Sequence, residues 1–111
     1  MNEKDEDQEI KDFQKTFVAL KTCAWIFSEW GLSDQDRSQL LSSTSDEERL
    51  IKASYIIGIY KNLHILFENS DQADNWIHRP NRYFEGRPAL DVMLEGDLKR
   101  VRSYLDYMVS N

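Results

Sequence analysis

Apolar residues recur along most of the chain at the three- and four-residue spacing of amphipathic helices. The first such stretch predicts a helix over residues 10–30, with Gly31 at its end. Its apolar positions are Phe13, Phe17, Leu20, Ala24 and Phe27. Residues 1–9 before it are mostly charged, and we expect an acidic arm or a frayed first turn there.

Serine residues mark the start of the next two helices. Ser33 precedes acidic residues and fits the N-cap of a short helix that ends near Leu41. Ser45 with Glu48 three positions later is the pattern of a capping box, which predicts a long helix ending near Phe67. That helix is apolar nearly all round. We therefore expect it to be central, either wrapped by other helices or shared with a second chain.

Three shorter helical segments complete the pattern. Ser70 can cap a helix over residues 71–77, and Pro88 fits the first position of another that Gly96 ends. The last helix spans residues 97–109, and its apolar face comprises Leu98, Val101, Leu105 and Met108. The sequence thus predicts an all-α fold, a compact bundle of about five to six helices around a long central hydrophobic helix.

The stretch from residue 76 to residue 94 contains the only segment that reads as a loop between packed helices. Both prolines of the chain, Pro80 and Pro88, lie in it together with Gly86. Proline fixes its own φ and glycine permits a positive φ, so these three residues are expected to shape the loop. A loop held in this way loses less entropy when it docks on a partner.

Large apolar residues around this loop are expected to form the core of the C-terminal half. They are Trp76, Phe84, Leu90, Met93, Leu98, Val101 and Leu105. Trp76 is assigned to the core because it ends an amphipathic helix, and a contact with a partner remains the alternative for it.

The overall composition fits one acidic domain of 111 residues, 41% of them apolar. Twenty acids against 14 bases give a net charge of −6, which argues against a simple cationic nucleic-acid binder. Cys23, the only cysteine, lies in an apolar helical run and is expected to be buried. A single cysteine suits a reducing cytosol, and with no signal peptide or membrane span in the pattern we expect a cytoplasmic protein.

Residue patterns for catalysis or metal binding are not found in the sequence. His64 and His78, the only histidines, have no cysteine or carboxylate at the spacing of a known metal motif. No nucleophile signature or phosphate-cradling glycine loop occurs either. We therefore expect no enzymatic activity, no metal and no cofactor.

Positive charge gathers in residues 79–102, where six bases outnumber four acids by two in an otherwise acidic chain. The arginines either pair with local acids and helix C-termini, or approach an acidic or phosphate-binding groove on a partner protein. Under the second interpretation the candidate contact residues are Arg79, Asn81, Arg82, Tyr83, Glu85, Arg87, Arg100 and Arg102.

The chain from Arg49 onward resembles the C-terminal toxin-binding domain of the Xre/MbcA/ParS antitoxins. The stretch "RLIKASYIIGIYKNLHILF" is similar to the central helix of that domain. The pattern W-x-x-x-P-N-x-x-F-x-G-R-x-A-L-D follows from Trp76 to Asp91, and Val101-Arg102 and Tyr104-Leu105-Asp106 complete the similarity. The resemblance covers residues 49–108, more than half of the chain.

This resemblance implies an antitoxin that binds a RES-domain toxin, a class that consumes NAD or transfers ADP-ribose. The antitoxin would cover the active site of the toxin and exclude NAD. A homodimer formed by the central helix or by the N-terminal helices is also expected.

The N-terminal half resembles only the opening of the helix-turn-helix region of that family. Between Leu41 and Arg49 stands "SSTSDEE", too short and too acidic for a recognition helix that reads a major groove. The expected division is an acidic arm at 1–9, a degenerate helical region at 10–45 and a toxin-binding domain at 46–111. DNA binding is thus doubtful. An antitoxin that still binds its promoter, or a helical adaptor without a toxin, remains the alternative.

Overall fold

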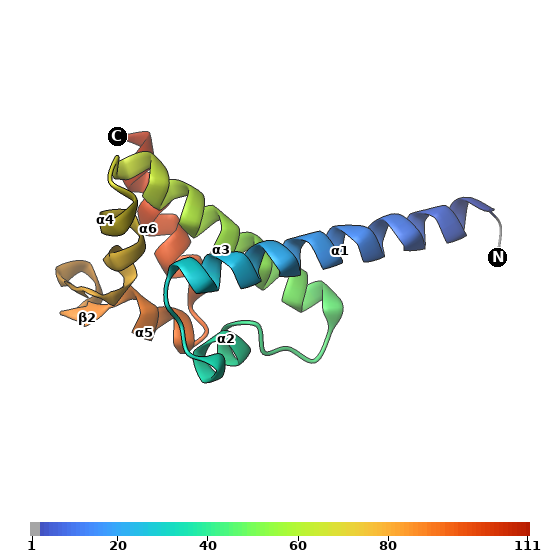
Figure 1. The fold of residues 1–111 in the computed structure, drawn as a ribbon, viewed down its shortest axis with the longest axis horizontal. Coiled ribbons are helices and arrows are strands. Elements are labelled where there is room, and N and C mark those ends of the chain that lie inside the picture. The colour runs from blue at the N-terminus through green and yellow to red at the C-terminus, as the bar shows by residue number, and fades with distance from the viewer. Residues whose placement is uncertain (1–2) are drawn as a thin grey trace.

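The fold is all-α, as the sequence predicts, in a computed structural model that describes residues 3–111 and side chains from Asp5 onward (Figure 1). Its helices in this range are α1 (Glu3–Glu29), α2 (Asp34–Leu40), α3 (Asp46–Leu66), α4 (Ser70–Asn75), α5 (Ala89–Leu94) and α6 (Leu98–Ser110). Between α4 and α5 lie two 3-10 helices, η1 (Trp76–His78) and η2 (Arg82–Phe84), and two short strands, β1 (Pro80–Asn81) and β2 (Arg87–Pro88).

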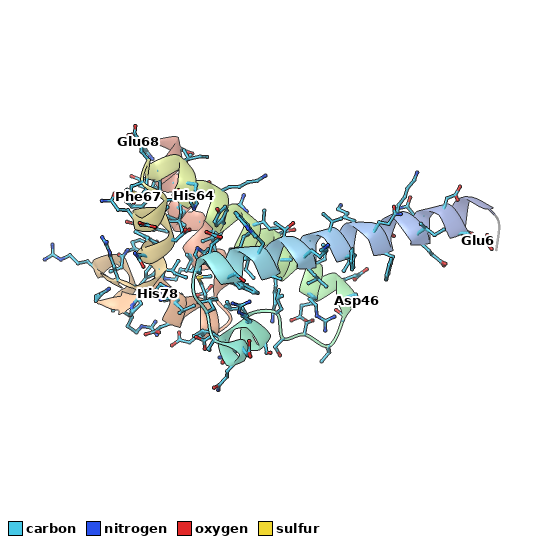
Figure 2. All side chains as sticks on the ribbon, in the orientation of Figure 1. Glu6, Asp46, His64, Phe67, Glu68 and His78 are labelled. Carbon is cyan, nitrogen blue, oxygen red and sulfur yellow. The ribbon has the colours of Figure 1, made fainter. Side chains whose placement is uncertain are left out.

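Helix α1 begins earlier than the sequence predicts, at Glu3 instead of residue 10. The acidic segment is helical because Glu, Lys and Gln are good helix formers and acids in a first turn complement the helix dipole. Its N-terminal half projects away from the rest of the molecule, and Glu6 lies near its far end (Figures 1 and 2). The expected arm is therefore the first part of one long helix.

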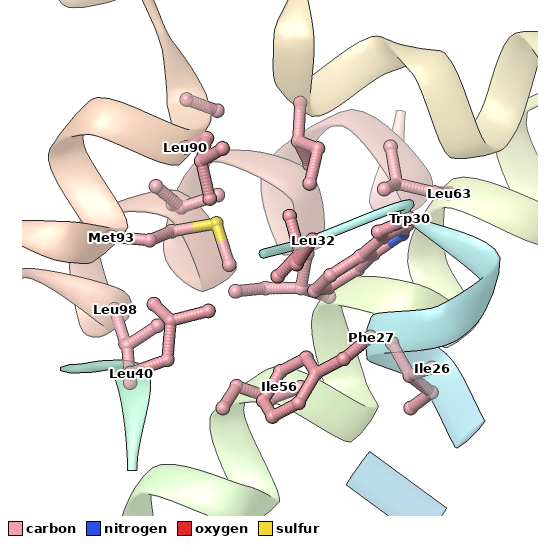
Figure 3. Packing of buried hydrophobic residues seen from close by; sticks show 14 of the residues in the cluster. Ile26, Phe27, Trp30, Leu32, Leu40, Ile56, Leu63, Leu90, Met93 and Leu98 are labelled. Carbon is pink, nitrogen blue, oxygen red and sulfur yellow. The ribbon is translucent and has the colours of Figure 1, made fainter. Parts of the chain in front are cut away.

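Helix α3 occupies the central position that its apolar sequence predicts. It packs against α1 on one side and α6 on another (Figure 1). Ala53, Ile56, Ile59 and Leu63 on α3 are buried in the shared core, which Figure 3 shows from close by. Ile65 at its C-terminal end is 66% exposed, so the helix is not covered all round by this chain alone.

Caps fix the starts of α2 and α3 as predicted. The Ser33 hydroxyl accepts from the Asp36 amide at 3.1 Å, and the Ser45 hydroxyl accepts from the Glu48 amide at 3.1 Å. The expected capping box is only half formed. The Ser45 amide donates to the Ser43 hydroxyl at 3.1 Å instead of to the side chain of Glu48.

Two other boundaries differ from the sequence prediction. Asn69, not Ser70, caps α4, and its side chain accepts from the Gln72 amide at 3.0 Å. Asparagine is as good an N-cap as serine, so the sequence could not choose between neighbours. Pro88 is the N-cap residue of α5 with ψ 147°, one position before the first helical residue.

The residues expected to form the core of the C-terminal half are buried, with one exception. Phe84, Met93, Val101 and their predicted companions Leu90, Leu98 and Leu105 are at most 9% exposed. Trp76 is only partly buried and packs against the edge of this core. Met108, expected on the inner face of the last helix, is 42% exposed. No helix within residues 3–111 is both long and apolar enough to cross a membrane.

Candidate functional site

The loop between α4 and α5 carries most of the candidate contact residues, and we call residues 79–88 the arginine loop. Its two ends pair as antiparallel strands, with Pro80 opposite Pro88 and Asn81 opposite Arg87. The strand pair is short because proline has no amide hydrogen to donate and cannot extend a ladder. Both ends of the loop are thereby held side by side.

The tip of the arginine loop is closed by the backbone and side chain of Asn81. The Gly86 amide donates to the Asn81 carbonyl at 2.9 Å, and the Tyr83 amide donates to the Asn81 side chain at 2.8 Å. Glu85 and Gly86 both have positive φ, 57° and 81°. Glycine adopts this conformation without cost, whereas a residue with a Cβ is strained by about 1 kcal/mol, so the turn is held against a local penalty at Glu85.

Four aromatic rings pack together at the arginine loop, two from the loop itself and two from the helices beside it. Phe84 is fully buried, while the Tyr83 ring stacks on the Tyr104 ring with centroids 4.2 Å apart. Tyr104 in turn stacks on Trp76 at 6.2 Å and meets Phe84 edge-on at 5.7 Å. Tyr83 keeps 51% of its surface exposed. Tyr104 belongs to the residues that carry the resemblance, but the sequence alone did not place it beside the loop.

Arg100 on α6 clamps the arginine loop to this aromatic cluster. Its Nη2 donates to the Tyr83 carbonyl and to Glu85 Oε1, both at 3.2 Å. Its guanidinium carbon lies 5.7 Å from the Tyr83 ring centroid and 5.3 Å from that of Phe84. Carbonyl, carboxylate and ring faces are the partners that a planar guanidinium prefers. Arg100 thus has a structural role beside its candidate role in contact.

The N-terminal helices anchor the base of the loop, a link that the sequence did not reveal. His78 Nε2 donates to the Trp30 carbonyl at the end of α1, at 2.7 Å, and Figure 2 shows where His78 lies. The Gln39 side chain on α2 donates to the Leu94 carbonyl on α5 at 2.8 Å. Both contacts satisfy carbonyls that a helix end leaves unpaired. The N-terminal half therefore supports the site.

The arginines of the loop differ in whether their side chains form hydrogen bonds and ion pairs within the protein. Arg87 pairs with Glu95 on the C-terminal side of α5, and this carboxylate raises the pKa of Arg87. Arg79 and Arg82 are exposed and make no side-chain hydrogen bond or ion pair with the part of the chain that the structure describes. Two of the three loop arginines are therefore available to a partner.

Arg102 lies away from the loop, on the side of α6 that faces α3. Its Nε donates to Asp106 Oδ1 at 2.9 Å, and Asn62 on α3 donates to the same oxygen at 2.7 Å. Bonds from Arg102 and then from Asn62 lower the pKa of Asp106 below its usual 3.8. Gly58 leaves room for the guanidinium on α3. The structure thus joins Arg102 to α3 and not to the other candidate residues.

His64, on the apolar helix α3, is packed against neighbouring side chains. Its Nε2 lies 2.9 Å from Asp74 Oδ1 on α4, and its ring packs against Tyr60 with centroids 4.2 Å apart and the ring planes tilted by 35°; Figure 2 shows where His64 lies. This pair ties α4 to the central helix. Within the described residues no group of three or more potential ligands could hold a metal ion.

The N-terminal half, expected to resemble the opening of a helix-turn-helix region, has no helix between α2 and α3 that could serve as a recognition helix. α2 has seven residues and ends at Leu40, and α3 begins at Asp46 after a turn that Arg49 braces by donating to the Leu41 and Ser43 carbonyls at 3.4 and 3.3 Å. The turn is followed directly by the acidic start of α3. This geometry agrees with the short acidic spacer in the sequence.

A comparison with protein families decides what the C-terminal half is. Residues 62–109 match the model of the antitoxin Xre/MbcA/ParS C-terminal toxin-binding domain, a span that contains the arginine loop, Tyr104 and Arg100. Residues 62–109 belong to the Xre/MbcA/ParS toxin-binding domain family. The resemblance inferred from the sequence is thereby confirmed, and family membership supports a role as an antitoxin that binds a toxin.

A similar chain extends the likeness beyond the matched domain. The uncharacterized protein y4oB of Sinorhizobium fredii is 40% identical over 98 residues, covering 73% of this chain and 76% of y4oB. That coverage is larger than the span from residue 62 to residue 109, so part of the upstream region is shared too. No solved structure matches the chain.

Proposed function

We propose that this antitoxin belongs to a type II toxin–antitoxin pair and neutralises a RES-domain toxin. Membership of the toxin-binding domain family supports the antitoxin role, and the specific toxin class is our proposal. The observation that carries it is the arginine loop, a braced turn inside the matched span with Arg79 and Arg82 free to bind. The protein would act by binding in the cytoplasm and not as an enzyme.

The proposed mechanism is that the arginine loop and α6 cover the active-site cleft of the toxin and exclude NAD. A cleft that binds the phosphates of NAD contains positively charged groups or hydrogen-bond donors. The arginine loop presents carboxylate as well as guanidinium groups to this cleft. Arg79 and Arg82 would bind carboxylates at the cleft rim, since a guanidinium forms two parallel hydrogen bonds with a carboxylate. Tyr83, half exposed on its stack, would supply the apolar contact.

The remaining candidate residues would surround these three. Asn81 and Glu85 shape the tip of the loop, and Arg87 and Arg100 hold its two sides through Glu95 and Glu85. Arg102, bonded to Asp106 on the side of α6 that faces α3, lies away from the loop, and we propose it only as part of the edge of the contact surface. A surface preorganised by internal bonds loses little entropy on docking.

An inhibition assay with a purified RES-domain toxin tests the proposal. The double variant Arg79→Glu/Arg82→Glu should weaken inhibition of NAD consumption by about thirtyfold or more, the effect of losing a hot spot of about 2 kcal/mol. Lys61→Glu, at an exposed position of α3, is the matched control and should leave inhibition unchanged. Undiminished inhibition by the double variant would show that the contact surface lies elsewhere.

The choice of toxin class is tested separately. Co-purification of the wild-type chain with the RES-domain protein is expected, and failure of the two to associate would overturn that partner.

We also propose that the antitoxin is a homodimer and does not bind its promoter by itself. A gel shift with the upstream DNA should show no complex, because the acidic first turn of α3, directly after the turn that follows α2, repels phosphate.

A further inference from the structure

One face of α1 repeats apolar residues at alternating intervals of three and four. We call this face the α1 seam, and it consists of Ile10, Phe13, Phe17, Leu20, Ala24 and Phe27. A strict repeat of this kind has a period of 3.5 residues, which is the spacing that packs one helix along another as a coiled coil. The same spacing also serves a helix that covers a globular core, so the exposure of the repeat decides whether it needs a further partner.

The N-terminal half of the seam has no cover from this chain. Phe13 is 71% exposed, and Ile10 and Phe17 are 56% and 54% exposed. The Phe13 and Phe17 rings stack on each other with centroids 6.4 Å apart. The N-terminal half of α1 projects from the globule (Figure 1). Isolated helical segments of three or four turns are marginal in water, so this half needs a partner.

The seam also borders two hollows that a second helix would enter. The larger one, of about 640 Å³, is lined by Phe13, Phe17 and Leu20 of α1 and by Leu50 at the start of α3, with Asp46 and Glu47 at its acidic edge. The other is lined by Leu20, Ala24 and Phe27 together with Arg37 and Arg49. One groove therefore runs along α1, apolar at its base, with two arginines toward its globular end.

We propose that α1 of a second copy of this chain lies in this groove, antiparallel to the first. The proposal rests on the homodimer proposed above and specifies its interface. Phe13 of each copy packs opposite Phe17 of the other, and Ile10 packs opposite Leu20. Phe13, the most exposed apolar side chain of α1, is thereby covered together with Ile10 and Phe17 in both copies, which removes their surface from water.

Charge selects the antiparallel arrangement. Residues 5–12 carry five acids and one lysine, net −4, whereas residues 13–28 carry two lysines and no acid, net +2. Parallel helices would place both acidic halves side by side. Antiparallel helices place Asp7 of one copy opposite Lys21 of the other, on the same flank of the seam, twice by symmetry.

The acidic end of the second helix meets the arginines of the groove. In this arrangement Glu6 of one copy lies opposite Ala24 of the other, beside the hollow that Arg37 and Arg49 line. Lys21 already lies along the seam, with its Nζ 5.5 Å from the centroid of the Phe17 ring. The second copy is therefore complementary to the groove in charge as well as in apolar surface.

The arrangement predicts the stoichiometry of the toxin complex. The arginine loop lies at the end of the molecule away from the projecting half of α1 (Figure 1). An antiparallel pair of α1 helices holds the two arginine loops at opposite ends of the dimer, where each can bind one toxin without meeting the other. We therefore expect a complex of two antitoxins and two toxins.

Charge reversal tests the arrangement in the full-length chain. Asp7→Lys turns two attractive pairs into repulsive ones and should raise the dissociation constant of the dimer about tenfold in analytical ultracentrifugation. Lys21→Asp alone should weaken the dimer as well, and the double variant Asp7→Lys/Lys21→Asp should restore it. Both positions are exposed, so the fold is retained, which circular dichroism checks.

Disulfide trapping gives a second, independent readout. Oxidation of an equal mixture of Ile10→Cys and Leu20→Cys chains should yield the mixed disulfide dimer, and Ile10→Cys alone should yield little. Two results together would overturn the antiparallel arrangement but not the homodimer. These are a disulfide dimer formed by Ile10→Cys alone, and failure of the double variant Asp7→Lys/Lys21→Asp to restore dimerisation. A wild-type monomer at all concentrations would overturn both the arrangement and the homodimer, and none of these results bears on whether the arginine loop inhibits a toxin.

Discussion

The guanidinium of Arg102 on α6 lies directly against the backbone of Gly58 on α3. A Cβ added to Gly58 would come within 1.7 Å of Arg102 Nη1 and 2.2 Å of its Cζ, far inside contact distance. From this position Arg102 bonds Asp106 and reaches the Ser54 carbonyl at 3.5 Å. Glycine in the middle of a helix is otherwise unfavourable, so its place in α3 is explained by the room it leaves for this arginine.

A double-mutant cycle should show that coupling. In the Arg102→Ala background, Gly58→Ala should raise the free energy of unfolding by about 1 kcal/mol, the gain in helix propensity. In the wild type the same change should bring no gain, because the guanidinium must leave Asp106. Urea unfolding measures both differences. Equal effects in the two backgrounds would mean that the contact carries no energy.

The lowered pKa of Asp106 predicts how stability depends on pH. A carboxyl whose pKa is lower in the folded state stabilises the protein above its unfolded pKa of 3.8, and this stabilisation is lost as pH falls through the folded pKa. The difference in free energy of unfolding between wild type and Asp106→Asn should be constant from neutral pH to about pH 5 and shrink below about pH 4. Glu68→Gln, at an exposed position, serves as the control.

Cys23 should be chemically silent in the folded protein. Burial raises the pKa of its thiol from 9.0 to about 12, and its sulfur faces the Ala53 carbonyl at 3.7 Å. At pH 8 the thiolate fraction is then about a thousandfold below that of the unfolded chain, so a thiol reagent such as dithiobisnitrobenzoate should react slowly until denaturant is added. Ser103→Cys, on an exposed position of α6, should react at once and acts as the control.

The clamp made by Arg100 should affect toxin binding more than stability. Arg100→Met keeps the packing on the rings of Tyr83 and Phe84 but removes the bonds to the Tyr83 carbonyl and to Glu85. The cost in unfolding free energy should stay below about 1 kcal/mol because the ion pair is partly exposed.

A looser loop must lose more entropy on docking, so the affinity of Arg100→Met for the toxin should fall about tenfold. Titration calorimetry against the toxin measures this, with Lys99→Met, exposed on the same helix, as the control. Wild-type affinity in the Arg100 variant would argue that the clamp does not preorganise the contact surface.

Local signals in the sequence were sufficient for the helices and for most of their ends. The spacing of apolar residues, the serine caps at Ser33 and Ser45 and the glycine ends at Gly31 and Gly96 depend on neighbouring residues only, so they are readable without a fold. The family could also be inferred from the sequence, because the spacing of the motif residues from Trp76 to Asp91 can be read without knowing the fold. Where two adjacent residues could serve equally, as at Asn69 and Ser70, the sequence could not choose between them.

Only the tertiary structure decided what each candidate side chain faces. Arg79, Arg87 and Arg102 look alike in sequence, yet one is free, one pairs with Glu95 and one fills the space above Gly58. These partners come from helices far apart in the chain, and the packing angle of α3 and α6 sets which of them meet. The apolar repeat of α1 was visible in the sequence. Only the positions of α2 and α3 show that the first half of this repeat is exposed, because burial is a property of the whole fold.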